Sequence, residues 1–357
     1  MKTLGDASNG RDNNFNLIRM IAAWSVLISH SWPLAWGFGT PEPLSGLIGF
    51  PLGTTAVVVF FAISGFFITQ SFDRSASLLD FTIARVLRIF PALIITLLLI
   101  VMIMGPLMTN LSLWEYFTHI ETITYIPRNA SLISLQGGLP GVFAANPYGN
   151  AINGSLWTLL YEVSCYVGLA ILGVAGALEK GRFKYFLIVF LIAQLYLTIF
   201  PSDWPVIKHL SRLSLAFFIG VSFYVFRHRI PLHWAVIPIL LVMTYLLWST
   251  FLRQPMFLLT LSYSCFWFGH LAWWGRAAYN RLGDYSYGMY IYAFPVQQTV
   301  VALNPGISPM GVIIPSTIAT LLLAMLSWYI VEKPALSRRR DAASFLTIIG
   351  RMSSSRI

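Results

Sequence analysis

Long apolar runs recur along the whole chain and constrain its fold more than any other feature. The 357 residues are 57% hydrophobic and only 10% charged, whereas soluble proteins carry about 25% charged residues. A run of roughly 20 apolar residues is long enough to cross a bilayer as a helix. Ten candidate spans occur, at approximately 14–36, 53–72, 89–107, 155–178, 185–200, 213–226, 233–249, 256–273, 285–303 and 311–331. The sequence therefore predicts an all-α polytopic membrane protein with about ten transmembrane helices.

The positions of Lys and Arg predict how these helices are oriented. Of the 23 Lys and Arg residues, 18 fall in the termini and connections on one side, four on the other and one, Arg19, within the first span. Such residues accumulate on the cytoplasmic side of membrane proteins, so we expect both termini in the cytoplasm. The net charge of +10 then follows from topology, and nucleic acid binding is not expected.

The sequence predicts a simple domain organisation, because it contains no internal repeat or separate soluble domain. We expect one transmembrane domain over residues 1–340, with a long outer loop at 109–153, and a cytoplasmic tail at 341–357. Cys165 and Cys265 both fall inside predicted spans, which supports neither a disulfide framework nor a thiolate metal site. We therefore expect no metal.

The outer loop at 109–153 is rich in aromatic residues: Trp114, Tyr116, Phe117, Tyr125 and Tyr148. Structureless loops of this length are uncommon unless they are functional. The loop could cover an outward-facing cleft and contact a polar ligand through aromatic faces. Its aromatic side chains could equally be anchors at the membrane interface. Both interpretations stay open.

Two ionisable residues lie on one face of the first predicted span. Arg19 and His30 are eleven residues apart, which on an α-helix is about 1100°, within roughly 20° of three turns. At about 1.5 Å per residue, they are separated by roughly 16 Å along the axis. Each side chain is costly in hydrocarbon, so each indicates a partner, a wet cavity or a function.

Glu162 lies at the depth of His30 and is the one acidic residue that we place well inside a span. By the helical rise, Glu162 is roughly 10 Å and His30 roughly 9 Å below the outer surface. A carboxylate beside an imidazole raises its basicity and fixes its tautomer, as a general base acting on a hydroxyl requires. The alternative is a structural polar pair between two helices. The function is favoured because an isolated pair at this depth is costly.

Arginines form a second candidate site near the cytoplasmic side. Arg85 and Arg88 are i, i+3 neighbours at the start of the third span, and Arg19 is five residues inside the same boundary. Three guanidinium groups at one level can hold phosphates through forked hydrogen bonds. For Arg85 and Arg88 alone, the alternative is the ordinary enrichment of cations at a cytoplasmic helix end. Ser64 and Gly65, in the second span, remove bulk where another helix or a thin ligand could approach.

Five short motifs then occur in a characteristic order. They are Asn16-Leu-Ile-Arg19 with His30 after ten further residues, Phe60-Phe61-Ala-Ile-Ser-Gly65-Phe66, Arg85-Val-Leu-Arg88 with Pro91, Ser155-Leu-Trp157-Thr-Leu-Leu-Tyr-Glu162 and Tyr329-Ile-Val-Glu332-Lys-Pro334. This ordered set resembles the acyltransferase-3 family of integral-membrane O-acyltransferases over nearly the whole chain. One position departs from the family: many members have a histidine where this chain has Ala293, so no role of that histidine is carried over.

The resemblance implies transfer of an acetyl group from cytoplasmic acetyl-CoA to a sugar hydroxyl of a surface polysaccharide, such as an O-antigen, or of a lipid-linked glycan. It implies a multi-pass protein of the bacterial inner membrane, in contact with membrane lipid, and leaves the oligomeric state open. Three residues would hold the phosphates of the donor: Arg19, Arg85 and Arg88. The thin arm of CoA would pass Ser64 and Gly65, and His30, supported by Glu162, would deprotonate the sugar hydroxyl. An acetyl-histidine intermediate is an alternative.

A transporter for an anionic or glycan substrate is the main alternative function. It would also hold arginine, histidine and glutamate within the membrane. Transporters often show paired interrupted helices in two related halves, and this sequence shows no such repeat.

Overall fold

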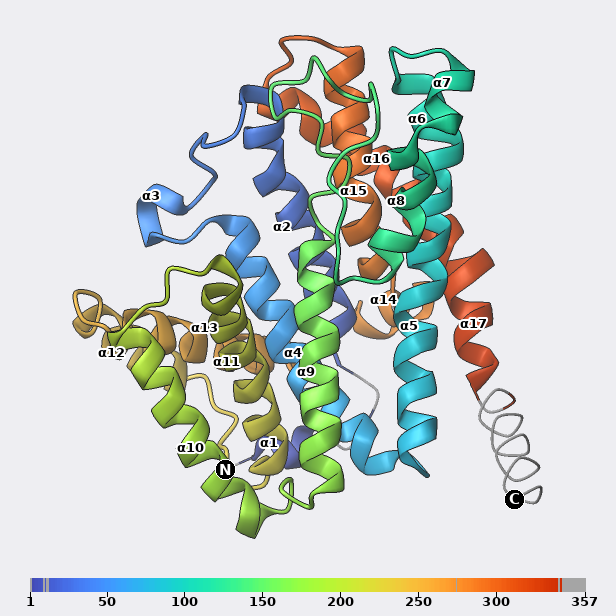
Figure 1. Cartoon of the computed structure of the whole chain (residues 1–357). Helices are drawn as coiled ribbons and strands as arrows, with labels where there is room; N and C mark the ends of the chain where they lie inside the picture. Colours follow the sequence, from blue (N-terminus) through green and yellow to red (C-terminus); the bar gives the residue numbers. More distant parts are fainter. Residues whose placement is uncertain (1, 9, 11–12, 274, 340, 342–357) are drawn as a thin grey trace. The chain divides into compact units, whose positions relative to one another are not determined.

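The structure is a computed structural model that describes residues 2–8, 10, 13–273, 275–339 and 341 (Figure 1). Helices dominate this part of the chain, where strand pairing is limited to two isolated bridges, Thr3 with Pro231 and Thr109 with Val142. The prediction of an all-α membrane protein is therefore confirmed for the fold class. Of the predicted cytoplasmic tail at 341–357, residues 342–357 lie outside the described residues.

Every predicted span falls on a helix. These helices are α2 (Phe15–Trp36), α4 (Leu52–Arg74), α5 (Leu78–Leu99), α9 (Trp157–Val174), α10 (Lys180–Ile199), α11 (Pro205–Val225), α12 (Val236–Leu246), α13 (Arg253–Gly269), α15 (Ser286–Leu303) and α16 (Pro309–Ser327). Two of them continue further: α5 through the π-helix η1 (Ile100–Met104) into α6 (Gly105–Met108), and α16 through the π-helix η2 (Trp328–Glu332) into α17 (Lys333–Ser337).

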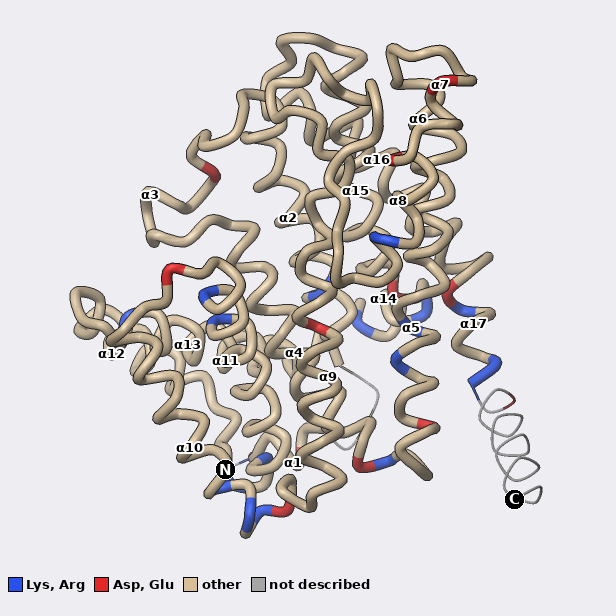
Figure 2. Tube along the Cα trace, in the orientation of Figure 1, with Lys and Arg blue, Asp and Glu red and all other residues tan. Residues whose placement is uncertain are grey.

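Six of these helical segments are long and apolar enough to cross a membrane, among the residues that the structure describes. They are α4, α5 with its extension to Met108, α9, α10, α11, and α16 with its extension to Ser337. The count of ten spans and the cytoplasmic position of the termini stay predictions. Figure 2 shows that charged residues are sparse along these helices and gather near helix ends, as at the start of α10 and along α17.

Five further helices are short: α1 (Leu4–Ala7), α3 (Ser45–Ile48), α7 (Leu113–Thr118), α8 (Ile120–Ala130) and α14 (Arg276–Leu282). Two of them, α7 and α8, lie inside the predicted outer loop, which is therefore partly helical. Tyr116 of α7 is fully buried, and its hydroxyl donates to the carbonyl oxygen of Val101 in η1 at 3.0 Å. Gly105 leaves the space for this phenol, because a Cβ there would lie 1.9 Å from the Tyr116 hydroxyl oxygen. The loop is thus packed against the third membrane helix.

The chain divides into two compact units, each assembled from distant segments. Unit 1 comprises Met1–Ala22, Thr54–Arg74 and Tyr161–Gly283, and unit 2 comprises Ala23–Gly53, Ser75–Leu160 and Asp284–Ile357. The division falls within α2, α4 and α9, so each of these helices contributes residues to both units.

Close helix packing through glycine organises unit 1. Gly65 of α4 faces the backbone of α11, where a Cβ would lie 1.9 Å from the carbonyl oxygen of Phe217. Gly220 of α11 faces α4 in the same way, 2.0 Å from the carbonyl oxygen of Ala62. Small residues at such contacts let membrane helices approach closely enough for extensive van der Waals contact. The pair of glycines therefore sets the distance between α4 and α11.

Buried polar groups hold α15 in unit 2. The Gln297 side chain is fully buried and donates to the carbonyl oxygen of Leu27 and to the hydroxyl of Ser31, both at 2.8 Å. Side-chain amides commonly join helices in this manner within membranes. Gly288 of α15 also packs against the backbone of Ala324 in α16. These contacts fix α15 beside the part of α2 that carries His30.

Candidate functional site

The predicted site residues divide between the two units. Those in unit 1 are Arg19, Ser64, Gly65 and Glu162. Those in unit 2 are His30, Arg85 and Arg88.

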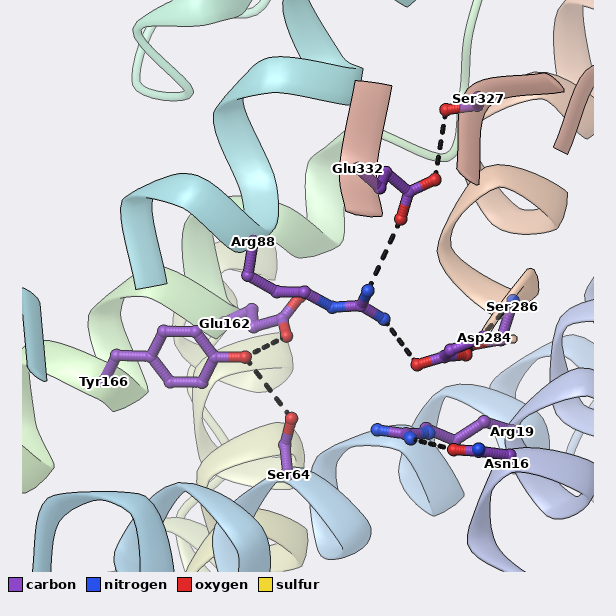
Figure 3. A network of polar contacts seen from close by, with 10 residues as sticks. All are labelled: Asn16, Arg19, Ser64, Arg88, Glu162, Tyr166, Asp284, Ser286, Ser327 and Glu332. Carbon is purple, nitrogen blue, oxygen red and sulfur yellow. Dashed lines mark hydrogen bonds and ion pairs between the residues drawn. The ribbon is translucent and has the colours of Figure 1, made fainter. Parts of the chain in front are cut away.

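In unit 1, a hydrogen-bonded network centres on Tyr166 (Figure 3). The Tyr166 hydroxyl donates to the Glu162 carboxylate, and it lies 3.4 Å from the Ser64 hydroxyl. Tyr166 and Glu162 are four residues apart on α9, so they share one helix face. The phenol thus links the predicted carboxylate on α9 to the predicted serine on α4. Sequence reasoning missed Tyr166, although its i, i+4 spacing from Glu162 was a usable signal.

The two small residues of α4 have different surroundings. Ser64 is half-buried and contacts Tyr166, whereas Gly65 is buried against α11. The space that Gly65 leaves is occupied by the backbone of α11, so its lack of a side chain serves helix packing. Contact of either residue with a donor molecule stays a prediction.

Arg19 is half-buried on α2, and its guanidinium donates to the side-chain oxygen of Asn16 at 2.6 Å (Figure 3). Asn16 is three residues earlier on the same helix, so the contact is a local one that orients the long arginine side chain. Both residues belong to the Asn16-Leu-Ile-Arg19 motif.

In unit 2, His30 is in contact with an aromatic ring of α15. The imidazole lies edge-on to Phe294, with 5.3 Å between ring centroids and 77° between ring planes. Its Nδ1 atom is buried and has no hydrogen-bond partner among the residues that the structure describes. The neighbouring position in α15, Ala293, is also buried. The His30 imidazole therefore packs against an apolar ring on this side, and its Nδ1 atom is available for a hydrogen-bond partner.

Both serines beside His30 are hydrogen-bonded. Ser31 donates to the carbonyl oxygen of Leu27 at 3.0 Å and accepts from Gln297. Ser29 donates to the carboxylate of Glu42 and accepts from the backbone N–H of Gly53 at 2.8 Å. These bonds tie this turn of α2 to α15, to the following loop and to the start of α4. The position of His30 is thus fixed by its neighbours in sequence.

Arg88 forms the centre of an ion-pair cluster in unit 2 (Figure 3). Its guanidinium lies 2.7 Å from the Asp284 carboxylate and 3.4 Å from the Glu332 carboxylate. Ser286 donates to Asp284 at 2.5 Å, and Ser327 donates to Glu332 at 3.0 Å. One cation therefore faces two carboxylates, each of which accepts a further hydrogen bond.

This cluster shows that one arginine of the predicted phosphate site is already paired with carboxylates. Arg88 is engaged by carboxylates, so a phosphate that binds it has to share or displace one of them. Arg85, three residues earlier, instead lies over the Phe81 ring, with 5.8 Å from its guanidinium carbon to the ring centroid. The two arginines thus have different surroundings, although the sequence predicts the same role for both.

Sequence reasoning did not predict that a second carboxylate on a long apolar helical segment is buried. Glu332 is 2% exposed and lies within the apolar helical segment that runs to Ser337. The last helix does not end near residue 331, because η2 and α17 continue it. The positive charge of Arg88 offsets the cost of burying the Glu332 carboxylate. The contact between these two side chains joins residues that are 244 positions apart. Nothing local in the sequence indicates it.

Four of the aromatic residues of the outer loop separate into three groups. Tyr116 and Tyr125 are at most 1% exposed and belong to the core of unit 2. Trp114 is 79% exposed. Tyr148 lies against Phe294, with 5.6 Å between ring centroids. Of these loop residues, Tyr148 is the one that packs on the ring beside His30.

Comparison with known proteins agrees with this reading of the motifs. The family model described as an acyltransferase domain matches residues 12–329. A protein named O-acetyl transferase from Shigella phage Sf6 is 33% identical over 340 residues, which cover 92% of this chain and 97% of that protein. Nodulation protein 10 of Rhizobium leguminosarum bv. viciae is 29% identical over 374 residues, which cover 93% and 95%. No solved structure matches. The chain belongs to the acyltransferase-3 family.

Proposed function

We propose that this protein transfers an acetyl group from cytoplasmic acetyl-CoA to a sugar hydroxyl of a surface polysaccharide or lipid-linked glycan, at the outer side of a bacterial inner membrane. Membership of an acyltransferase family supports acyl transfer. Similarity to a protein named O-acetyl transferase supports acetyl as the acyl group and oxygen as the acceptor atom. The observation that carries the mechanism is the buried, unpartnered Nδ1 of His30, within the part of the chain that the structure describes.

A buried ring nitrogen without a hydrogen bond costs about 1–3 kcal/mol. Membrane proteins retain such a group where it serves a function. Phe294 holds the imidazole from one side, and the hydrogen bonds of Ser29 and Ser31 hold its helix turn. His30 is therefore a positioned imidazole, as general-base catalysis requires. Glu162 is its proposed supporting carboxylate, and Tyr166 would orient that carboxylate through its hydrogen bond.

In the proposed reaction, His30 takes the proton of a sugar hydroxyl while the hydroxyl oxygen attacks the thioester carbonyl carbon. The tetrahedral adduct then collapses, the carbon–sulfur bond breaks, and the CoA sulfur leaves with the proton that His30 held. Sugar acetate and CoA are the products, with no net change in protons or electrons. Transfer through an acetyl-histidine intermediate gives the same products in two steps.

The donor would be held by its phosphates. Arg19, Arg85 and Arg88 supply the proposed cationic groups, since guanidinium forms forked, charge-assisted hydrogen bonds with phosphate oxygens. Because Arg88 already pairs with Asp284 and Glu332, a phosphate that binds it would share or displace one of these carboxylates. Through these ion pairs Arg88 would also keep the start of α5 in place.

Release of CoA by the purified protein tests this function. A thiol reagent detects CoA, and the two free cysteines of the protein are buried, so they contribute little signal. We expect turnover of acetyl-CoA by the wild type and its loss in His30→Ala. His119→Ala is the matched control, because His119 is a 42% exposed histidine of the outer loop. Turnover that survives in His30→Ala would exclude His30 as the base. A protein that consumes no acetyl-CoA in the presence of glycan would exclude the function itself.

A further inference from the structure

Three aromatic rings in unit 2 lead from an exposed surface to His30. Phe38 is 85% exposed, and its ring lies 5.8 Å from that of Tyr148. The Tyr148 ring lies 5.6 Å from that of Phe294, which in turn lies 5.3 Å from the imidazole. Phe294 is only 2% exposed. The row therefore ends, on its exposed side, in an aromatic surface that is two or three ring contacts from His30.

Hydrogen bonds hold Tyr148 in this position. The Asn146 side chain donates to the Gln298 backbone oxygen at 2.9 Å and to its side-chain oxygen at 2.7 Å. The Gln298 side chain donates to the carbonyl oxygens of Gly149 and Ala151, at 3.2 and 2.8 Å. Gln298 is fully buried in α15, so this part of the loop is anchored in the core. The Tyr148 ring is preorganised, which lowers the entropic cost of binding a ligand against it.

Glu42 places a carboxylate close enough to Tyr148 to act electrostatically on its phenol. It accepts a hydrogen bond from Ser29, the residue before His30, so it is tied to the helix turn that carries the imidazole. Burial raises the pKa of the Tyr148 phenol, and the negative charge of Glu42 raises it further. None of the ion pairs among the described residues involves Glu42. Its carboxylate therefore keeps acceptor capacity for a ligand.

We propose that Phe38, Tyr148 and Glu42 form the acceptor subsite, and that this subsite takes a neutral sugar. The proposal rests on the acetyl transfer proposed above. The C–H faces of a sugar ring are apolar and pack on aromatic rings, whose π faces carry partial negative charge. A carboxylate accepts charge-assisted hydrogen bonds from sugar hydroxyls. The same carboxylate repels an acidic sugar, which gives the subsite selectivity through repulsion.

The test uses two glycosides that differ only in a carboxylate in place of a primary alcohol: p-nitrophenyl β-D-glucopyranoside and p-nitrophenyl β-D-glucuronide. The measurement is the increase in CoA release that each causes above the rate with water alone. We expect the KM of the wild type to be lower for the glucoside than for the glucuronide. The KM for the glucuronide divided by the KM for the glucoside should be about tenfold smaller in Glu42→Gln than in the wild type. This substitution removes the repelling charge and keeps an acceptor for Ser29.

Aromatic substitutions test the stacking surface. Tyr148→Ala should raise the KM for the glucoside about threefold to tenfold, the range for loss of one aromatic contact. The KM for acetyl-CoA should stay the same. Tyr148→Phe keeps the aromatic ring, so its KM for the glucoside should be close to that of the wild type. Trp114→Ala, at the 79% exposed tryptophan of the same loop, is the matched control and should change neither constant.

The outcomes separate this inference from the proposed function. The subsite is overturned if Tyr148→Ala leaves the glucoside KM unchanged, or if Glu42→Gln leaves the ratio of the two KM values unchanged. It is also overturned if neither glycoside accelerates CoA release by a protein that consumes acetyl-CoA. The proposed function fails by a different result, namely the absence of acetyl-CoA consumption by the wild type.

Discussion

Replacement of Arg88 by alanine probes the ion-pair cluster of unit 2. The Arg88 guanidinium lies 2.7 Å from Asp284 and 3.4 Å from Glu332, whose side chains are only 11% and 2% exposed. Removal of one partner from a buried ion pair costs about 3–5 kcal/mol. Because Arg88 itself is 21% exposed, we expect a loss of about 3 kcal/mol in the free energy of unfolding. With about 2.1 cal/mol/K of unfolding entropy per residue over the 357 residues, this corresponds to a decrease in Tm of about 4 °C.

Unfolding can be followed through Cys165 and Cys265, which are both buried. A maleimide dye that fluoresces on reaction with a thiol reports their exposure as the temperature rises. The matched variant combines Arg88→Ala with Glu332→Gln, which removes one of the two carboxylate charges. We expect it to regain part of the lost Tm, since members of one ion-pair network are energetically coupled. Equal Tm values for the wild type and Arg88→Ala would refute a stabilising cluster.

Three further predictions concern donor binding, helix packing and pH. Arg85→Ala should raise the KM for acetyl-CoA about tenfold, the effect of losing a charge-assisted hydrogen bond; an unchanged KM would rule out its role in donor binding. Gly65→Ala should lower Tm sharply or prevent folding, because its Cβ would lie 1.9 Å from the Phe217 carbonyl oxygen. Gly168→Ala, whose Cβ would meet nothing within 4 Å, should stabilise α9 by about 0.5–1 kcal/mol, and equal effects of the two changes would contradict the close approach of α4 and α11. Burial raises the pKa of the Glu42 carboxyl, so protonation favours the folded state and wild-type stability should decrease as pH rises through the titration of this group. The Tm of Glu42→Gln relative to the wild type should therefore increase as the pH rises from about 4 through the titration of this carboxyl, and a constant difference would contradict this burial.

The membrane helices could be predicted from the sequence because continuous apolar runs are their direct cause. The ends of the helices could not be predicted as well. The last helix continues past the charged residues Glu332 and Lys333 to Ser337, where the sequence pattern suggests a stop. The reason is the distant Arg88, which pairs with Glu332. A helix end of this kind depends on a tertiary contact.

The candidate site shows the same division between local and distant causes. Helical spacing alone places Arg19 and His30 on one helix, and the same spacing links Glu162 with Tyr166. Contacts between segments that are distant in the sequence produce no such regular spacing. Phe294 reaches His30 from the far end of the chain, so no periodicity in the sequence predicts that contact.

The central claim is that His30 activates the sugar hydroxyl for acetyl transfer. Its most direct test is the proton NMR spectrum of surface polysaccharide from cells that carry either the wild type or His30→Ala, at equal amounts of protein in the membrane. We predict that O-acetyl signals are present with the wild type and absent with the variant. O-acetyl signals of equal intensity in the two samples would contradict the claim.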